Sequence, residues 1–179
     1  PEAFSCTLTG AGNDLWGSSD GLHFVYQETS ENFEIEATFN SLLPSDNWAK
    51  VGLMVRDGTA ANARNMCVVV SSANGYRIQV RNATGGETVS AVPGGVPGAA
   101  TATTPVTFKL VKKRGKIETY VNGVHTPYGG TDIDVSGWSP NLCVGLALTS
   151  HNNTRLGFTL ATDVSFKIVH KSGSVMMLR

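Results

Sequence analysis

Short segments in which apolar and polar residues alternate are the feature that most limits how this chain can fold. In residues 33–39, four apolar side chains alternate with three polar ones. Successive side chains of a β-strand point to opposite faces, so this pattern indicates a strand with one buried and one solvated face. Residues 76–81 repeat it, and Asn74-Gly75, between them and an apolar strand at 65–71, is typical of a hairpin turn.

About twelve short strands can be delimited in this way, with turn residues every ~8–12 positions and no convincing helix. This spacing predicts an all-β fold, a two-sheet antiparallel β-sandwich or jelly roll. We expect a single domain over residues 1–170. The apolar tail at 171–179 is expected to form an edge strand, on its own domain or exchanged with a neighbour.

The stretch 18–27 opens with Asp20-Gly21, which we predict to be a tight turn because glycine accepts positive φ. The strand that follows presents Leu22, Phe24 and Tyr26 on one face. If that face is the core, His23 and Gln27 lie on the open face. The same reasoning for residues 50–56 and 76–81 places their Lys, Arg and Gln side chains outside.

Charge and hydropathy exclude two classes of partner. The 179 residues carry 14 basic and 14 acidic side chains, whereas a nucleic-acid binder needs a basic stripe. No apolar run approaches the ~18 residues of a membrane helix, so no membrane insertion is expected. The chain begins at Pro1 with no signal peptide, which fits either a mature form or an excised segment.

The three cysteines allow at most one internal disulfide. Cys67 and Cys143 lie in apolar segments and are expected to be buried strand residues. Cys6 is left free to pair with either of them or with another chain. Asn82 and Asn152 begin N-x-Thr sequons in predicted loops, which favours a secreted or cell-surface glycoprotein.

Several motifs, taken in order, resemble one family. They are residues 12–20 with 23–27 (GNDLWGSSD and HFVYQ), 48–56 (WAKVGLMVR), 108–111 (FKLV) and 144–152 (VGLALTSHN). The resemblance is to the concanavalin-like domains typed by the yeast "regulation of enolase" protein, and it covers about residues 4–169. It implies a concanavalin-like jelly roll, often one module of a secreted multidomain protein, and no known activity.

Catalytic chemistry has one candidate pair. Glu34 and Glu36 share a strand face at roughly 6.5–7 Å, inside the window that glycosidases need. A third acidic residue expected for concanavalin-fold glucanases is missing. Ser150 and His151 are neighbours that point to opposite faces, without a nucleophile elbow. The four histidines lack zinc-ligand spacing. An enzyme is therefore the less favoured interpretation.

Planar polar side chains and exposed aromatic rings favour a sugar-binding surface, since they hydrogen-bond hydroxyls and stack on sugar rings. The candidate ligand-binding residues are Trp16, His23, Gln27, Glu34, Glu36, Trp48, Lys50, Arg56, Gln79, Arg81 and His151. No cofactor is expected, except that calcium stays open. Its candidate oxygen ligands are Asp14, Asp20, Asp132, Asp134 and Asn152. Loop Asp and Asn residues more often form turns.

Two functions are favoured by the sequence, and a third is much less favoured. The first is a non-catalytic carbohydrate-binding or recognition module of a secreted or surface protein, with a glycan or polysaccharide as partner. The second is a self-assembling fibre or coat subunit, favoured by zero net charge, the unpaired cysteine and the apolar tail. The third is a β-glycan hydrolase that uses Glu34 and Glu36.

Overall fold

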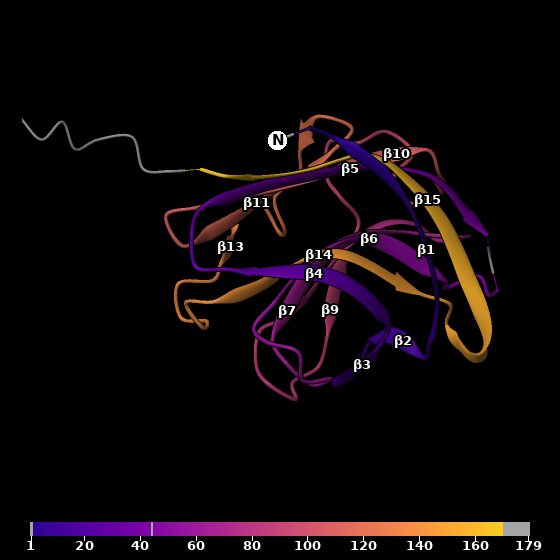
Figure 1. Cartoon of the computed structure of the whole chain (residues 1–179), viewed down its shortest axis with the longest axis horizontal. Coiled ribbons are helices and arrows are strands. Elements are labelled where there is room, and N and C mark those ends of the chain that lie inside the picture. The colour runs from indigo at the N-terminus through magenta and orange to yellow at the C-terminus, as the bar shows by residue number, and fades with distance from the viewer. Residues whose placement is uncertain (1, 44, 170–179) are drawn as a thin grey trace, which may run out of the picture.

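Two antiparallel sheets packed face to face make up the molecule (Figure 1). The computed structural model describes residues 2–43 and 45–169, which form fifteen strands and no helix. The predicted β-sandwich is thus confirmed, with three strands beyond the expected twelve because elements of two or three residues also pair. The strands are β1 (Phe4–Gly12), β2 (Asp14–Trp16), β3 (Ser19–Gly21), β4 (His23–Thr29), β5 (Phe33–Leu43), β6 (Lys50–Arg56), β7 (Asn65–Ser71), β8 (Gly75–Arg81), β9 (Val89–Ala91), β10 (Val106–Lys113), β11 (Lys116–Val121), β12 (Val124–His125), β13 (Ile133–Asp134), β14 (Leu142–Thr149) and β15 (Asn152–Ile168).

The seven-stranded sheet has the order β1-β15-β5-β10-β11-β12, with β13 paired to β11. The six-stranded sheet has the order β4-β14-β6-β7-β8-β9. Consecutive strands pair in β6-β7-β8-β9 and in β10-β11-β12, whereas β14 between β4 and β6 and β15 between β1 and β5 bring distant parts of the chain together. Figure 1 shows the hairpin of β2 and β3 as a separate small element beside the six-stranded sheet.

The core lies between the sheets and follows the predicted alternation. Phe33, Phe39 and Phe108 from one sheet and Leu53 and Ile78 from the other are fully buried. Burial of one such side chain contributes about 1.5–3 kcal/mol. We use the term outer face for the side of the six-stranded sheet that points away from this core.

The expected orientation of β6 and β8 is correct. Val51, Leu53 and Val55 of β6 belong to the core, as do Tyr76, Ile78 and Val80 of β8. The alternate positions of both strands therefore point to the outer face. The expectation that this face is open is wrong, because Lys50, Arg56, Gln79 and Arg81 are at most 2% exposed. Since cross-strand partners share a face, Arg77 of β8 lies beside Val69 of β7, which lies beside Gly52 of β6.

The expected orientation of β4 is wrong. Phe24 pairs with Ala147 and packs with Leu22 against a small apolar cluster on the outer face. His23 pairs with Leu148, a core residue, and so points toward the sandwich interior, although it is exposed at this edge strand. Both faces of β4 carry large side chains, and alternation alone does not say which face meets the core.

The β2–β3 hairpin covers the centre of the outer face. Leu15 is buried there against Met54, Cys67, Val69 and Ala147. This hairpin also corrects the predicted turn, because the chain reverses at Gly17-Ser18, where Gly17 has φ of 62°. Asp20-Gly21 belongs to β3 instead.

Gly21 serves close packing rather than a turn. A Cβ atom at this position would lie 2.8 Å from the backbone nitrogen of Asn13. Cβ atoms are not accommodated at such distances, so the close approach of the two chain segments requires glycine here.

Cys67 and Cys143 are buried strand residues, as predicted, and no disulfide forms among the described residues. Burial raises the pKa of Cys67 to about 12. Cys6 is partly buried against the core, and this burial raises the pKa of its thiol.

Asn82 is exposed after β8, while Asn152 begins β15 rather than lying in a loop. The tail 171–179 lies outside the described residues. Within 2–43 and 45–169, no helix is long and apolar enough to cross a membrane.

Candidate functional site

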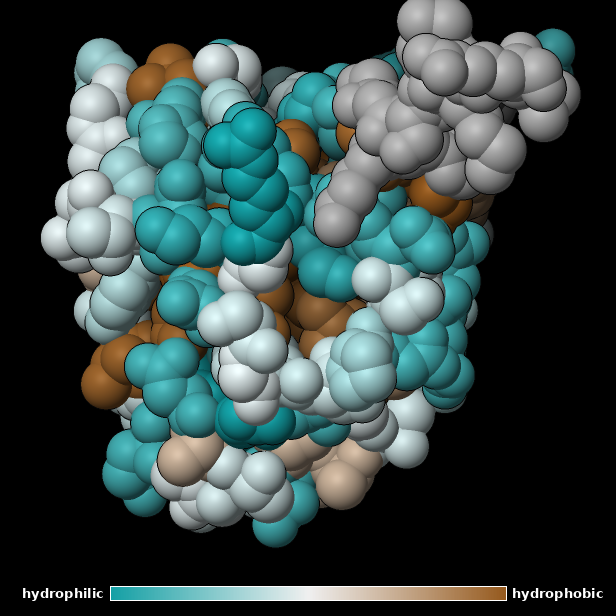
Figure 2. Space-filling model, turned by 90° about the vertical axis from the view of Figure 1, so that its left-hand side faces the viewer, coloured by the Kyte–Doolittle hydropathy of each residue, from teal (hydrophilic) through white to brown (hydrophobic). Residues whose placement is uncertain are grey.

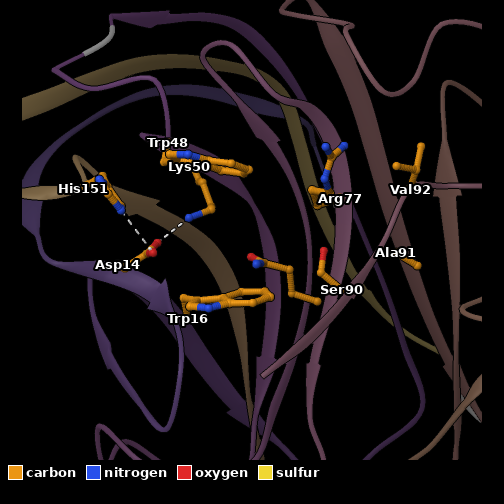
Figure 3. A pocket seen from close by; sticks show the side chains of 10 residues that line it. Asp14, Trp16, Trp48, Lys50, Arg77, Ser90, Ala91, Val92 and His151 are labelled. Carbon is orange, nitrogen blue, oxygen red and sulfur yellow. Dashed lines mark hydrogen bonds and ion pairs between the residues drawn. The ribbon is translucent and has the colours of Figure 1, made fainter. Parts of the chain in front are cut away.

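A pocket of about 610 Å³ opens on the outer face, between the β2–β3 hairpin and strands β8 and β9 (Figure 3). Four separate parts of the chain contribute to it: the hairpin, the start of β6, strands β8 and β9, and the turn after β14. Its lining consists of Asp14, Trp16, Trp48, Lys50, Arg77, Gln79, Ser90, Ala91, Val92 and His151.

Two indole rings stand at this pocket. Trp16 is 46% exposed and Trp48 is 41% exposed, which is high for the largest apolar side chains of the chain. Figure 3 shows them on opposite sides of the pocket, each ring seen nearly edge-on. The Trp48 backbone nitrogen donates to Asp46 Oδ1 at 2.8 Å, and Lys50 Nζ lies 5.5 Å from the centroid of the Trp48 ring.

A chain of charged groups forms one end of the pocket. Lys50 is only 2% exposed, and its Nζ pairs with Asp14 Oδ1. The other Asp14 oxygen lies 3.3 Å from His151 Nε2, and His151 Nδ1 lies 3.0 Å from Asp46 Oδ1. Both nitrogens of the imidazole therefore face carboxylates, and the lysine charge is compensated by Asp14.

The other end of the pocket is formed by β8 and β9. Gln79 is almost fully buried, and its Oε1 accepts from Cys67 Sγ at 3.7 Å. Arg77 is half-buried, and its Nη1 donates to the carbonyl oxygen of Tyr76 at 2.8 Å. Ser90 lies opposite Gln79 on β9 and is exposed.

Five of the eleven sequence-predicted binding residues line this pocket. They are Trp16, Trp48, Lys50, Gln79 and His151. Sequence reasoning missed Arg77, Ser90, Ala91 and Val92 as lining residues, and it named Asp14 only as a calcium candidate. The signal for Arg77 was present, because it alternates in phase with Gln79 and Arg81 on one strand.

Arg56 and Arg81 lie on the same outer face but are bound to Asp20. Arg81 Nη2 and Nη1 lie 2.7 and 2.8 Å from the two oxygens of Asp20, and Arg56 Nη1 lies 2.5 Å from one of them. Asn65 Nδ2 donates to the same carboxylate at 3.0 Å. Arg56 and Arg81 therefore share Asp20 as their partner. The cluster ties the hairpin to the sheet.

The remaining predicted residues lie elsewhere. His23 and Gln27 are on the inner side of β4, and Glu34 and Glu36 are on the seven-stranded sheet. Glu34 Oε2 lies 2.9 Å from Lys109 Nζ. The predicted carboxylate pair is thus separated from the tryptophan pocket by the whole core.

The calcium candidates are engaged by protein groups. Asp14 and Asp20 pair with the cations described above, and Asp132 Oδ1 lies 2.8 Å from His125 Nε2. Hydrogen bonds from the Ser136 hydroxyl and backbone hold the pKa of Asp134 below its usual value. Asn152 Oδ1 accepts from Thr154. Residues 2–43 and 45–169 contain no group of three His, Cys, Asp or Glu side chains placed to hold a metal ion.

A second hollow, of about 640 Å³, lies where the loops around residues 30–32, 114–115 and 135–140 meet. Figure 2 shows that end of the molecule as a largely hydrophilic surface with apolar atoms in the hollow near its centre. Lys112 Nζ donates to the carbonyl oxygens of Ser30 and Glu31 there. Its charge is therefore used to close the loop rather than offered to a ligand.

No family model matches the sequence, and no curated protein does. Solved structures do resemble it in fold. A functionally unknown protein from Saccharomyces cerevisiae has a TM-score of 0.59 at 17% identity, over 93% of this chain and 89% of that one. The carbohydrate-binding module CBM66 from Bacillus subtilis has a TM-score of 0.56 at 12% identity, over 93% and 96%.

A family 7 alginate lyase, A1-II′, has a TM-score of 0.59 at 12% identity, over 93% of this chain and 80% of that chain. At these identities the likeness shows the fold alone, a jelly-roll sandwich consistent with the concanavalin-like class expected from the sequence.

Proposed function

We propose that this domain is a non-catalytic carbohydrate-binding module, and that the glycan lies between Trp16 and Trp48. The observation that carries the proposal is the pair of half-exposed indoles on opposite sides of one pocket. The resemblance in fold to a carbohydrate-binding module and to alginate lyases supports it. Membership of the concanavalin-like family named above, and secretion, are parts of the same proposal.

The physical argument rests on the two-sided nature of sugars. A pyranose has an apolar face of C–H groups, which stacks on an aromatic ring, and an equator of hydroxyls that need donors and acceptors. The pocket supplies both, with the indoles on two sides and Asp14, Lys50 and Gln79 between them. The polar groups are held in place by their partners, so little conformational entropy is lost when a ligand binds.

Absence of catalysis is proposed from the contacts of His151, the one histidine that lines the pocket within residues 2–43 and 45–169. A general base needs a free ring nitrogen within reach of the substrate proton. Both nitrogens of His151 face carboxylates, so it would have to give up one contact first. A polysaccharide lyase is the competing enzyme, since lyases share the fold.

The test is calorimetric titration with a panel of neutral and acidic polysaccharides. We expect one class to bind, and Trp16→Ala and Trp48→Ala each to weaken it about tenfold or more, which is about 1.4 kcal/mol. Phe4→Ala is the matched control, because Phe4 is an equally exposed aromatic residue outside the pocket. Binding that both tryptophan variants retain would refute the site, and release of unsaturated products would refute the non-catalytic role.

Self-assembly has its own supporting observation. Leu156, Phe158 and Leu160 alternate on the outward side of β15, and Leu43 lies opposite Phe158. All four side chains are at least one-third exposed, which is an unusual grouping for large apolar residues. If this surface pairs copies of the chain, light scattering will give a multiple of 18.9 kDa that Phe158→Ser returns to the monomer mass. A monomeric parent protein would dismiss this second candidate.

A further inference from the structure

We infer that the bound glycan is acidic, and that Arg77 binds its carboxylate at the β8–β9 end of the pocket. The inference rests on the proposed function and names the class of sugar. Its basis is the distribution of charge in the pocket, together with the hydrogen bonds that Arg77 does and does not make.

The charge at the β8–β9 end of the pocket is not compensated, although the charges of the whole chain cancel. At the other end Asp14 pairs with Lys50, and Asp46, beside the lining, faces His151. This leaves the Arg77 guanidinium, which pairs with no carboxylate among residues 2–43 and 45–169. An uncompensated cation in a partly enclosed site attracts an anion more strongly than one in open water does.

Most N–H donors of the Arg77 guanidinium are also unused within the described residues. Nη1 is used by the Tyr76 carbonyl, and no other hydrogen bond of the guanidinium forms within the described residues. A guanidinium carries five N–H donors in a planar fork that matches the two oxygens of a carboxylate. Gln79 lies two residues along the same strand face, and with its Oε1 turned to Cys67 its amide nitrogen is the group left to donate.

The two ends of the pocket differ in charge, and this difference favours one orientation of an acidic sugar. Figure 3 shows Arg77 on the side away from Asp14 and His151. Near Asp14 a sugar carboxylate finds no unpaired cation, because Lys50 is paired with Asp14 and Asp46 lies close by, whereas sugar hydroxyls can donate to the Asp14 oxygens. A carboxylate at Arg77 is attracted, and the indoles lie between the two ends. The acid group is therefore oriented toward β8 and β9.

The test compares three oligosaccharides of equal length in calorimetric titrations. The first is a uronate oligomer, and the second is the same oligomer with its carboxylates reduced to alcohols. The third is the reduced oligomer with sulfate esters on its hydroxyls, which restore negative charge without a carboxylate. We expect the uronate to bind at least tenfold more tightly than the reduced oligomer. We also expect it to bind more tightly than the sulfated oligomer, because the planar fork matches a carboxylate.

Arg77→Gln should weaken uronate binding at least tenfold and change binding of the reduced oligomer less than twofold. Arg77→Lys, which keeps the charge but loses the fork, should fall between. Arg155→Gln is the control, since it removes the same charge from an exposed position on β15. Thermal unfolding of each variant checks that it is folded.

Each outcome decides one question. Equal affinity of the parent protein for uronate and reduced oligomers overturns the acidic-sugar inference and leaves the proposed function intact. Equal loss of both ligands in Arg77→Gln overturns the role of Arg77. A sulfated oligomer that binds as tightly as the uronate overturns the assignment of a carboxylate in favour of a general anion site. Failure of all three ligands to bind counts against the proposed function itself.

Discussion

Asp20 forms ion pairs with Arg56 and Arg81, two residues that were predicted from the sequence to bind a ligand. Sequence alternation correctly placed Arg56 and Arg81 on the outer face, and their chemistry suits a ligand. Their partner lies 36 and 61 residues away along the chain, and no local pattern reveals it. Once paired, the two guanidinium groups are 2% and 0% exposed, so they fix the hairpin instead of facing a ligand.

Replacement of Asp20 by Asn should destabilise the protein strongly. The carboxylate is 1% exposed, and its loss leaves two buried arginines without their counter-charge. Breaking a buried pair on one side costs about 3–5 kcal/mol. The free energy of unfolding from urea titrations will measure it. Asp132→Asn is the control, because the side chains of its pair with His125 are far more exposed, 24% and 44%, and its loss should change stability by less than about 0.5 kcal/mol. Similar losses in the two variants would contradict this assignment.

For a single strand, the sequence predicts which face meets the core when only one of the two faces is apolar. In residues 33–39, 50–56 and 76–81 the positions that face the core were predicted correctly. In β6 and β8 the opposite positions other than Arg77 are buried as well, which alternation did not predict. In β4 the alternation is real, but Leu22 and Phe24 on one face compete with Val25 on the other. Which face of β4 meets the core depends on which face the β2–β3 hairpin covers, and the position of that hairpin is set by long-range packing.

The hairpin itself depends on Leu15. This side chain fills the small apolar cluster with Met54, Cys67 and Val69, and it is 2% exposed. Leu15→Ala should cost about 2–5 kcal/mol, the range for a leucine truncated in a well-packed site. Because Asp14 and Trp16 flank it and line the pocket, glycan affinity should fall as well, even though Leu15 touches no ligand.

Denaturant unfolding and calorimetry on the same Leu15→Ala preparation will separate the two effects. Leu22→Ala offers a comparison, since Leu22 packs on the same cluster but lines no part of the tryptophan pocket. Loss of stability with full glycan affinity in Leu15→Ala would show that the hairpin does not position the binding groups.

At the scale of the whole molecule, the pocket is a product of topology. Trp16 ends β2, and Trp48 lies in the turn before β6. Gln79 comes from β8 and His151 follows β14, so four distant segments must fold before the site exists. The sequence indicated these residue types and their strand faces. It could not show that they share a sheet while Glu34 and Glu36 belong to the other, because sheet membership depends on strand order, which alternation does not encode.

If both sheets and the hairpin form one cooperative unit, binding at the pocket must stabilise all of it. A glycan at 100 times its Kd adds about 2.7 kcal/mol to the free energy of unfolding, and so raises Tm by about 5–10 °C for a domain of this size. Far-UV circular dichroism reports the strands, while tryptophan fluorescence reports Trp16 and Trp48 on the outer face together with Trp138. The two transitions should coincide and shift together, since two-state domains unfold as a whole. At the same glycan concentration, a tenfold loss of affinity in Trp16→Ala should reduce the stabilisation to about 1.4 kcal/mol, which is about half of the shift in Tm, and keep the coincidence. A fluorescence transition at lower temperature than the dichroism transition would mean that the outer face opens separately, so that binding stabilises only the elements around the pocket.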